Sequence, residues 1–323
     1  MPDNMNTSVL LVGAGGMAQE YAKVLQALEL PLTVVGRGQR SAESFESARG
    51  LKVHQGSLSS FFQKNGGTRF DHAIVAVGVD QLAAVSLQLI ERGVRNILVE
   101  KPAGLNSREV LAVAAGASRE DANIAVAYNR RFYSSLLKAK ELISQDGGVT
   151  SFQFEFTEWP HVIEALDVPE AVKHHWFLAN STHVIDMAFH IGGKPREITC
   201  FSSGGLSWHP ASSIYSGAGV SKQGALFSYQ ANWGAPGRWG VEVLTNKRRF
   251  IFRPLEKLQV QKTGSVAIEF LEIDDTLDRD YKPGLFRQVQ AFVRGAAGEL
   301  CSIQEQADMM AIYYKMSNYP PVG

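Results

Sequence analysis

A lysine followed by proline stands at the end of an apolar run, Ile97-Leu98-Val99-Glu100-Lys101-Pro102. The apolar residues predict a buried strand, and Pro102 ends it because proline has no backbone N–H to donate to a ladder. In open parallel sheets, ligands bind at the carboxyl ends of the strands. Lys101 is therefore the first candidate for chemistry, as a proton donor. The alternative is that Glu100 and Lys101 form a solvated pair at a strand end.

A glycine-rich turn, Gly13-Ala14-Gly15-Gly16-Met17-Ala18, lies between an apolar run and a helical pattern. It fits the spacing G-x-G-x-x-G/A, in which Gly13 permits a tight turn, Gly15 lets the backbone approach a pyrophosphate and Ala18 lets helix and strand pack closely. The start of the helix also offers free N–H groups and a partial positive charge to an anion. We expect Gly13, Gly15, Gly16, Met17 and Ala18 to bind a dinucleotide.

The residues after the second expected strand indicate which dinucleotide is bound. An NAD site usually has Asp or Glu there to hold the ribose 2′-hydroxyl, but the stretch Val34-Val35-Gly36-Arg37-Gly38-Gln39-Arg40 contains no acid. Arg37 and Arg40 can bind a 2′-phosphate, and a hydrogen bond to a charged group contributes roughly 1.5–3 kcal/mol. The sequence therefore favours NADP(H), with NAD(H) possible; the alternative is that both arginines belong to the loop surface.

His183 is a second candidate for proton transfer. Asn180 or Ser181 is expected to cap a helix that runs to about residue 191, which places His183 in the first turn and Asp186 one turn later on the same face. Near a helix N-terminus the dipole disfavours the protonated imidazole, so His183 would accept a proton. The alternative is a partly buried histidine that holds the helix to a sheet.

The elements that position these residues form two patterns. Up to about residue 127, short apolar runs alternate with helical patterns, which predicts a parallel, doubly wound α/β sheet. Strands are expected at 8–12, 32–35, 52–54, 72–77, 96–99 and 123–127, and helices at 17–28, 41–47, 57–64, 80–92 and 107–117. Ser41, Asp80 and Ser107 are the expected caps of three of these helices.

From residue 151 onward the pattern changes to that of strands packed on one face. Phe152, Phe154 and Phe156 alternate with polar residues, which is typical of an antiparallel sheet with one buried face. Further strands are expected at 224–233, 239–244, 249–252, 258–261 and 267–271. Two helices are expected at 284–294 and 302–316, the second with a capping box at 302–305.

Three stretches together resemble a known family. The glycine-rich turn, Glu100-Lys101-Pro102 and Tyr128-Asn129-Arg130-Arg131-Phe132 are similar to those of the glucose–fructose oxidoreductase, inositol dehydrogenase and rhizopine catabolism (Gfo/Idh/MocA) family. The resemblance covers the whole chain and implies a Rossmann domain at 1–128. It also implies an α+β domain at 129–323 with a large open, mainly antiparallel sheet, and C-terminal helices that can pack back on the first domain.

The resemblance also implies nicotinamide-dependent hydride transfer at a hydroxyl or keto carbon of a sugar, sugar phosphate or nucleotide sugar. Lys101 and His183 would be catalytic, with His183 moving the proton while Lys101 donates to the reacting oxygen at the domain junction. A cis Lys101–Pro102 bond is implied as well. Val77, Glu100, Lys101 and Asn129 complete the expected cofactor residues.

The substrate pocket is predicted from side-chain chemistry. Tryptophan faces stack on sugars, and arginine binds phosphate or carboxylate in bidentate fashion. The expected substrate-binding residues are Arg130, His175, Trp176, Asn180 and His183, with Trp233 and Arg238 as further candidates.

One position departs from the family pattern. The family commonly has an aspartate four residues before the catalytic histidine, where this chain has Ala179 followed by Asn180. An amide forms hydrogen bonds but cannot store a proton at neutral pH. Lys101 and His183 would then share proton transfer, or the chain would not turn over in the ordinary way. A sensor of NAD(P) and sugar without catalysis, and a reductase of a non-sugar ketone or imine, are the alternative functions.

Composition bounds the remaining possibilities. Lys and Arg number 32, as do Asp and Glu, among 323 residues, so no basic nucleic-acid footprint is indicated. The basic run 247–249 is expected to be a solvated hairpin turn. Cys200 and Cys301 are far apart, and the histidines between His161 and His209 have no compact ligand spacing, so no metal or disulfide is expected.

The expected setting follows from the same features. Met1–Thr7 lack the basic and apolar regions of a secretion signal, and no apolar stretch is long enough to span a membrane. We therefore expect a cytoplasmic protein without membrane or nucleic-acid partners. The resemblance implies a homodimer or homotetramer formed through the open sheet.

Overall fold

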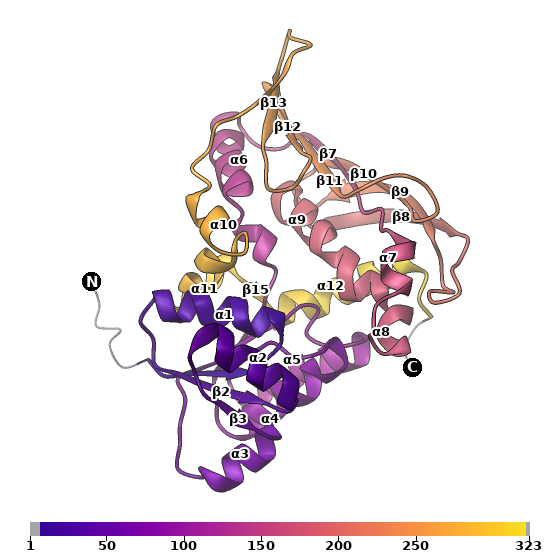
Figure 1. Ribbon diagram of the computed structural model, residues 1–323. Coiled ribbons are helices and arrows are strands. Elements are labelled where there is room, and N and C mark those ends of the chain that lie inside the picture. Colours follow the sequence, from indigo (N-terminus) through magenta and orange to yellow (C-terminus); the bar gives the residue numbers. More distant parts are fainter. Residues whose placement is uncertain (1–6, 321–323) are drawn as a thin grey trace. The chain divides into compact units, whose positions relative to one another are not determined.

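The computed structural model describes residues 7–320 of the chain. Residues 1–6, on which part of the expectation about Met1–Thr7 rests, lie outside this range. The chain forms two compact units: Met1–Ala127 with Leu285–Asp308, and Tyr128–Gly284 with Met309–Gly323 (Figure 1). No helix among the described residues is both long and apolar enough to cross a membrane.

The first unit contains a seven-stranded sheet with the order β15-β6-β5-β4-β1-β2-β3. Strands β1 to β6 pair in parallel, and β15 joins β6 antiparallel. The order 3-2-1-4-5-6 is that of dinucleotide-binding doubly wound folds, so the predicted fold class of this unit is confirmed. The strands are β1 (Val9–Val12), β2 (Leu32–Gly36), β3 (Val53–Gln55), β4 (His72–Val75), β5 (Asn96–Val99), β6 (Asn123–Val126) and β15 (Cys301–Ser302).

Helices cover this sheet in two groups, with α1 beside α2 and α11, and α4 beside α3 and α5. Strands β1, β4 and β5 are almost wholly apolar and buried because side chains on both of their faces meet helices. The helices are α1 (Gly16–Ala27), α2 (Gln39–Arg49), α3 (Leu58–Lys64), α4 (Leu82–Glu91), α5 (Ser107–Arg119) and α11 (Leu285–Val293), with short 3-10 turns η1 (Val79–Gln81) and η4 (Ala297–Glu299).

The three predicted helix caps are wrong. Helix α2 starts two residues before Ser41 and follows Gly38, which has no side chain to cap it. Asp80 lies inside the 3-10 turn η1, which precedes α4. Asn106, not Ser107, caps α5, and its side chain accepts a hydrogen bond from the Glu109 N–H at 3.1 Å. Each error has the same cause: several residues at a helix start can cap, and the local backbone decides which one does.

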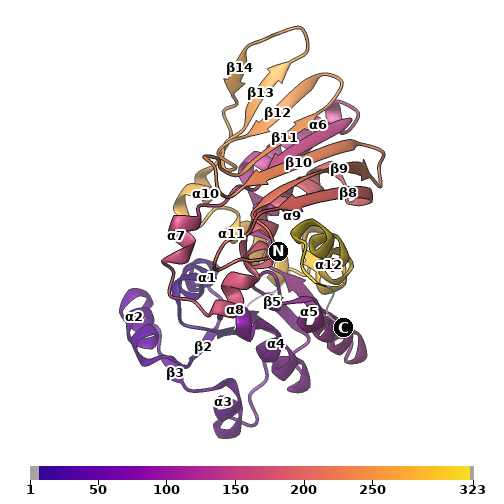
Figure 2. The ribbon, with the colours of Figure 1, turned by 90° about the vertical axis from the view of Figure 1, so that its right-hand side faces the viewer.

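The second unit contains an eight-stranded sheet with the order β14-β13-β12-β11-β7-β10-β9-β8 (Figure 2). All neighbours are antiparallel except β7 and β10, so the mainly antiparallel sheet is confirmed. The strands are β7 (Ser151–Glu155), β8 (Pro195–Ser203), β9 (Ile214–Ser221), β10 (Leu226–Asn232), β11 (Gly240–Leu244), β12 (Arg248–Phe252), β13 (Gln259–Lys262) and β14 (Ile268–Phe270).

Helix α9 (Thr182–Gly192) covers the inner face of this sheet and packs on β7 and β11. Phe189 of α9 makes edge-on ring contacts with Phe152, Phe154 and Phe227, with centroids 5.3–6.2 Å apart. Gly192 is required here because a Cβ would lie 2.4 Å from the Phe152 ring. The alternating phenylalanines thus anchor the helix that carries His183.

The remaining helical segments of the second unit are short, apart from α6. They are η2 (Asn129–Phe132), α6 (Ser134–Gln145), α7 (Pro160–Glu164), α8 (Glu170–His174), a π-helical turn at Phe177–Ser181 and α10 (Thr276–Asp280). Helix α12 (Ile303–Ser317) runs from the residues of the first unit into those of the second. Ser302 caps it as predicted, by accepting a hydrogen bond from the Glu305 N–H at 3.0 Å.

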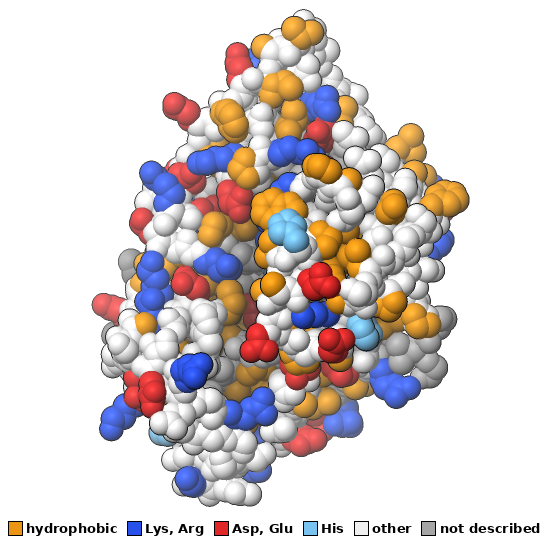
Figure 3. Space-filling model, turned by 45° about the vertical axis from the view of Figure 1, so that its right-hand side comes forward, with side chains coloured by type: hydrophobic (Ala, Val, Ile, Leu, Met, Phe, Trp, Pro, Cys, Tyr) orange, Lys and Arg blue, Asp and Glu red, His pale blue; other side chains and the backbone are white. Residues whose placement is uncertain are grey.

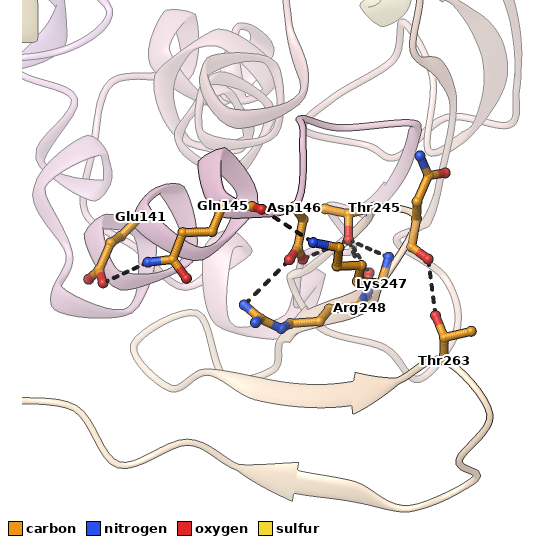
Figure 4. Close-up of polar contacts among 8 residues, drawn as sticks. Glu141, Gln145, Asp146, Thr245, Lys247, Arg248 and Thr263 are labelled. Atoms are coloured by element: carbon orange, nitrogen blue, oxygen red, sulfur yellow. Dashed lines mark hydrogen bonds and ion pairs between the residues drawn. The ribbon is translucent and has the colours of Figure 1, made fainter.

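Of the basic run 247–249, only Lys247 lies in the hairpin turn between β11 and β12, whereas Arg248 and Arg249 begin β12, so the prediction of a solvated turn is only partly right (Figure 4). The Arg248 guanidinium lies 3.7 Å from the buried carboxylate of Asp146, which also accepts a hydrogen bond from the Thr245 hydroxyl. Arg249 forms an ion pair with Glu242. The turn is therefore fastened to the end of α6 and to the sheet. On the face drawn in Figure 3, charges of both signs are interspersed.

Candidate functional site

The glycine-rich turn is packed against protein at one glycine and open at the next two. Gly13 has φ +123°, and a Cβ there would lie 2.1 Å from the Ala76 carbonyl oxygen of the neighbouring chain segment. A Cβ at Gly15 or Gly16 would meet nothing within 4 Å. Gly13 therefore packs against protein, whereas the open side of the turn at Gly15 and Gly16 is available to a ligand.

The start of helix α1 is open in the same way. Gly15 is its N-cap residue and has no side chain to accept a hydrogen bond from the first N–H groups. Ala18 is fully buried, which matches the expected close packing, and Met17 is half-buried. The helix start thus offers unclaimed N–H donors and a partial positive charge to an anion.

A hollow beside this turn contains Val77 and Arg37, two of the predicted cofactor residues. Strand β2 supplies Gly36, and the loop after β3 supplies Gly56 and Ser57 to the same hollow. Both Arg37 and Arg40 are exposed, and Arg40 lies in the first turn of α2 without lining the hollow. Within residues 7–320 neither arginine has an acidic partner in an ion pair. The two arginines thus place exposed positive charge near the end of β2.

Lys101 follows strand β5 as predicted, and the peptide bond to Pro102 is cis, as the resemblance implied. The adjacent carboxylate of Glu100 accepts a hydrogen bond of 2.6 Å from the hydroxyl of Tyr21, which lies on α1. Burial, then the charge of Glu100, raises the pKa of Tyr21 well above its usual value. Glu100 is thus fixed by a fully buried tyrosine that sequence reasoning missed, because Tyr21 looks like any core residue of an amphipathic helix. Glu100 is therefore not simply one of a solvated pair at a strand end.

His183 lies in the first turn of α9, as predicted, but the predicted cap at Asn180 or Ser181 is wrong because α9 continues an earlier helical turn. The π-helical turn Phe177–Ser181 leads directly into α9, and Ser181 has helical φ and ψ values with no capping hydrogen bond. The preceding residues already supply helical carbonyl groups, so the argument from an exposed helix N-terminus does not apply to His183. π-Turns of this kind occur frequently at functional sites.

A buried carboxylate that sequence reasoning missed lies against this π turn. Glu158, which is 2% exposed, accepts hydrogen bonds from Asn180 Nδ2 at 3.1 and 3.0 Å and from Ser181 Oγ at 2.7 Å. Because the Asn180 amide nitrogen faces Glu158, the amide oxygen is directed away from this carboxylate as an acceptor. The chain therefore has an acid beside the position where the family pattern would place an aspartate.

The two arginines of residues 128–132 have different surroundings. Arg131 forms a buried bidentate ion pair with Asp186, with distances of 2.9 and 2.6 Å. Arg130 lies over Trp239, with its guanidinium carbon 4.9 Å from the ring centroid. Burial lowers the pKa of Arg130. Arg131 and Asp186 therefore hold η2 to α9, while Arg130 is the one that can serve a ligand.

Aromatic rings connect Arg130 with His183 within the second unit. The Trp239 ring lies 6.3 Å from the imidazole of His183, and Tyr128 contacts the same imidazole at 6.3 Å. Tyr133 lies beneath Arg130, and burial raises its pKa to about 12. Trp239 and Tyr133 were not predicted, because a tryptophan at a strand start and a tyrosine before a helix have no distinctive spacing.

Four of the predicted ligand-binding residues make contacts within the second unit. Trp233 is 1% exposed and donates to the Phe156 carbonyl at 3.2 Å, so its proposed place in the substrate pocket is wrong. His175 contacts the ring of Tyr319, and Trp176 contacts that of Trp208. These rings belong to an aromatic cluster with Trp233 and His209. Asn129, expected at the cofactor, donates its amide to the Pro283 carbonyl at 2.9 Å.

Comparison with known proteins agrees with this architecture. Residues 7–128 match the family model described as "Oxidoreductase family, NAD-binding Rossmann fold". No curated protein matches the chain in sequence. Similar folds occur in many solved structures. The three described next are each less than 20% identical to this chain in sequence.

A levoglucosan dehydrogenase in complex with NADH and levoglucosan is 18% identical, with a TM-score of 0.77 and 96% of each chain covered. The UDP-N-acetylglucosamine 3-dehydrogenase of Acidithiobacillus ferrooxidans is 13% identical, with a TM-score of 0.74 and 97% of each chain covered. A protein of Desulfitobacterium hafniense, provisionally named an NADPH-dependent oxidoreductase, is 15% identical, with a TM-score of 0.79, 97% of this chain and 95% of that chain covered. Residues 7–128, which contain the glycine-rich turn and the parallel strands β1 to β6, are thus similar in sequence to the NAD-binding Rossmann domain of this oxidoreductase family.

Proposed function

We propose that this protein is a dehydrogenase or reductase that prefers NADP(H) and acts on a hydroxyl or keto carbon of a carbohydrate. The observation that carries the cofactor preference is the end of β2, where exposed Arg37 lines the hollow and no acid follows the strand. The names of the similar structures, which include sugar and nucleotide-sugar dehydrogenases, support a carbohydrate substrate.

The proposed roles of the residues follow from their chemistry. A bound nicotinamide would supply hydride acceptance or donation. Gly15, Gly16 and the first N–H groups of α1 would bind the pyrophosphate, and Arg37 and Arg40 a 2′-phosphate. Lys101 would donate a proton to the reacting oxygen and His183 would exchange a proton with it. Asn180 and Arg130 would bind and orient the substrate.

Glu158 provides a carboxylate next to Ala179, the position at which the family pattern has an aspartate. Its carboxylate fixes the Asn180 amide three residues before His183. We assign Glu158 a positioning role, because it accepts hydrogen bonds from Asn180 and Ser181 of the π turn. The outer face of the sheet, with exposed Phe201, Leu226 and Phe270, is the surface through which we propose that copies of the chain associate.

The cofactor is tested by titrating the protein with NADPH and NADH and following nucleotide fluorescence. Tighter binding of NADPH is expected, and Arg37→Ala should reduce NADPH affinity by about tenfold to a hundredfold, since one charged hydrogen bond contributes roughly 1.5–3 kcal/mol. NADH affinity should change little. Stronger binding of NADH by the unaltered protein would contradict the preference.

The reaction is tested by screening sugars, sugar phosphates and nucleotide sugars for cofactor oxidation or reduction. On an active substrate, Lys101→Ala should lower turnover by about 10²- to 10⁴-fold if Lys101 acts as a general acid. Near-full activity of this variant would exclude that role. Tight binding of cofactor and sugar without turnover would identify a sensor, and turnover restricted to ketones or imines without a sugar would identify the other reductase class.

A further inference from the structure

A stack of arginine and tryptophan side chains lies beside His183 in the second unit. The Arg238 guanidinium carbon is 4.5 Å from the centroid of the Trp159 ring and 5.0 Å from that of Trp239. Arg130 lies 4.9 Å from the same Trp239 ring. Two guanidinium groups are thus held against aromatic faces, which leaves the N–H groups in the plane of each guanidinium for other partners.

The stack is built by segments that are far apart in sequence. Trp159 follows β7, while Arg238 and Trp239 precede β11. The indole N–H of Trp159 donates to the Gly237 carbonyl at 3.1 Å, which fastens one segment to the other. Trp239 is 7% exposed, and its buried indole N–H has no hydrogen-bond partner among the described residues. Arg238 and Trp159 are exposed, so the stack is fixed at its base and open to solvent.

The charges of Glu256 and then Glu158 act on Arg130, and Glu155 lies beside Arg238. Glu158 accepts hydrogen bonds from Asn180 and Ser181. Glu155 forms an ion pair with Arg253 at 2.9 Å, and it accepts only the backbone N–H of Arg238. Arg238 also lowers the pKa of Arg130 through like-charge repulsion, after the larger effect of burial. An anion between the guanidinium groups would relieve this repulsion and use their free donors.

We propose that Arg238 and Arg130, supported by Trp159 and Trp239, bind an anionic group of the substrate, so that the protein acts on a sugar carrying a carboxylate or a phosphate. This inference rests on the proposed function, in which the reacting carbon of the sugar lies at His183. The aromatic faces suit the sugar ring, which presents C–H groups to them, while the guanidinium N–H groups suit paired oxygens of the anion.

The test is equilibrium binding without turnover, read from quenching of tryptophan fluorescence because Trp159 and Trp239 flank the site. The probes are glucuronate, glucose 6-phosphate, UDP-glucose and uncharged methyl glucoside, each with and without NADPH. We expect at least one anionic probe to bind tenfold or more tightly than methyl glucoside. The three anionic probes separate a carboxylate, a phosphate monoester and a diphosphate as the group recognised.

Two variants and a control distinguish binding at this site from a general effect of the protein's charge. Arg238→Gln should weaken the best anionic probe by about tenfold to a hundredfold and flatten the salt dependence of its binding. Arg238→Lys should restore only part of the affinity, because lysine keeps the charge but not the planar, bidentate donors. Arg196→Gln, at another exposed arginine, is the control and should change nothing.

The outcomes that overturn the proposal differ from those that overturn the proposed function. Equal binding of charged and uncharged probes, or an unchanged Arg238→Gln variant, would exclude the anion site. Turnover of an uncharged sugar at the same rate in the Arg238→Gln variant would leave the dehydrogenase in place and remove the anion site. Binding of an anionic probe that depends on Arg238, without hydride transfer on any substrate, would retain the anion site and remove the dehydrogenase.

Discussion

Glu158 shows how a single buried carboxylate changes the interpretation of a whole sequence pattern. Counted along the sequence, the position four residues before His183 is Ala179, and the expected acid is missing. In space, Glu158 from the loop after β7 meets the next two residues, Asn180 and Ser181. A contact between residues 22 positions apart could not be predicted from local spacing.

A substitution at Glu158 should separate positioning from stability. Glu158→Gln keeps the shape, and its amide oxygen can still accept from Asn180 and Ser181 as Oε1 does, but an NH2 group replaces Oε2, so the second Asn180 hydrogen bond is lost and two NH2 donors face each other. We expect the Asn180 amide to lose its fixed orientation, raising the KM for the sugar about tenfold while the affinity for NADPH is unchanged. Steady-state kinetics with the active sugar and a thermal melt measure both effects.

The control for this prediction is Glu242→Gln, at a second carboxylate of the same unit that is bonded to Arg249 on the outer face of the sheet. It should leave the KM unchanged. A Glu158→Gln variant with normal KM and kcat but a lowered melting temperature would show that Glu158 is only structural.

At the scale of elements, the glycine-rich turn behaves as one unit with β1 and α1. The sequence predicted the strand, the turn and the helix, because a periodic apolar pattern on each side of closely spaced glycines has few other solutions. It could not distinguish the glycine that packs on protein from the glycines that face a ligand. The structure does so at Gly13, where the Ala76 carbonyl occupies the space that a Cβ would need.

Two alanine substitutions in this turn should therefore affect different properties, one the stability of the fold and the other the binding of NADPH. Gly13→Ala should destabilise the fold strongly, because a methyl group would overlap a backbone oxygen at 2.1 Å in a left-handed conformation. Gly15→Ala should fold normally, since its Cβ meets no protein atom within 4 Å, but weaken NADPH binding by tenfold or more. Chemical denaturation and nucleotide titration check the two variants. A stable Gly13→Ala protein, or unaltered NADPH affinity in Gly15→Ala, would contradict the division of roles.

The second sheet was predicted less completely than the first. The alternation of apolar and polar residues in β7 and β10 revealed the central strands, whereas β8 and β9 were missed. Strand β9 contains Ser216-Gly217-Ala218-Gly219, whose small residues have weak strand propensity. Gly217 and Gly219 are needed there because a Cβ would lie about 2.5 Å from the rings of Tyr229 and Phe227 on β10. Packing across the sheet, which has no signature in a single strand, decides this element.

At the scale of the whole chain, a buried histidine links stability to pH. The ring of His209 is fully buried, with Nδ1 2.8 Å from the Ser212 carbonyl and Nε2 2.7 Å from the Tyr319 hydroxyl. The carbonyl can only accept, so Nδ1 carries the proton and the tyrosine donates to Nε2. Burial lowers the pKa of His209 to about 4.

Protonation then favours unfolding in a defined pH range. An unfolded histidine titrates near pH 6.5, and the folded one near 4, so the stabilising contribution is complete above about pH 6.5 and is lost as the pH falls toward 4. The free energy of unfolding should fall by up to about 1.4 kcal/mol per pH unit in this range. Denaturation curves between pH 7 and 4 measure the slope.

The matched variant is His209→Gln, which cannot take up a proton. Its slope with pH should be smaller than that of the unaltered protein. His190, whose pKa burial lowers to about 3, adds a slope of the same sign and remains in both proteins. Identical slopes in the two proteins would show that His209 does not set the pH dependence.

The π turn at Phe177–Ser181 has a consequence for insertion and deletion. A π turn holds one residue more than an α-helical turn, so removal of one residue from it would leave an unbroken α-helix. Residues before the turn would then rotate by about 100° relative to those after it, since an α-helix has 3.6 residues per turn. His175 and Trp176 would face a new direction while His183 and Asp186 kept theirs. Deletion of a single residue from the π turn would thus reorient the side chains before it and leave those of α9 in place.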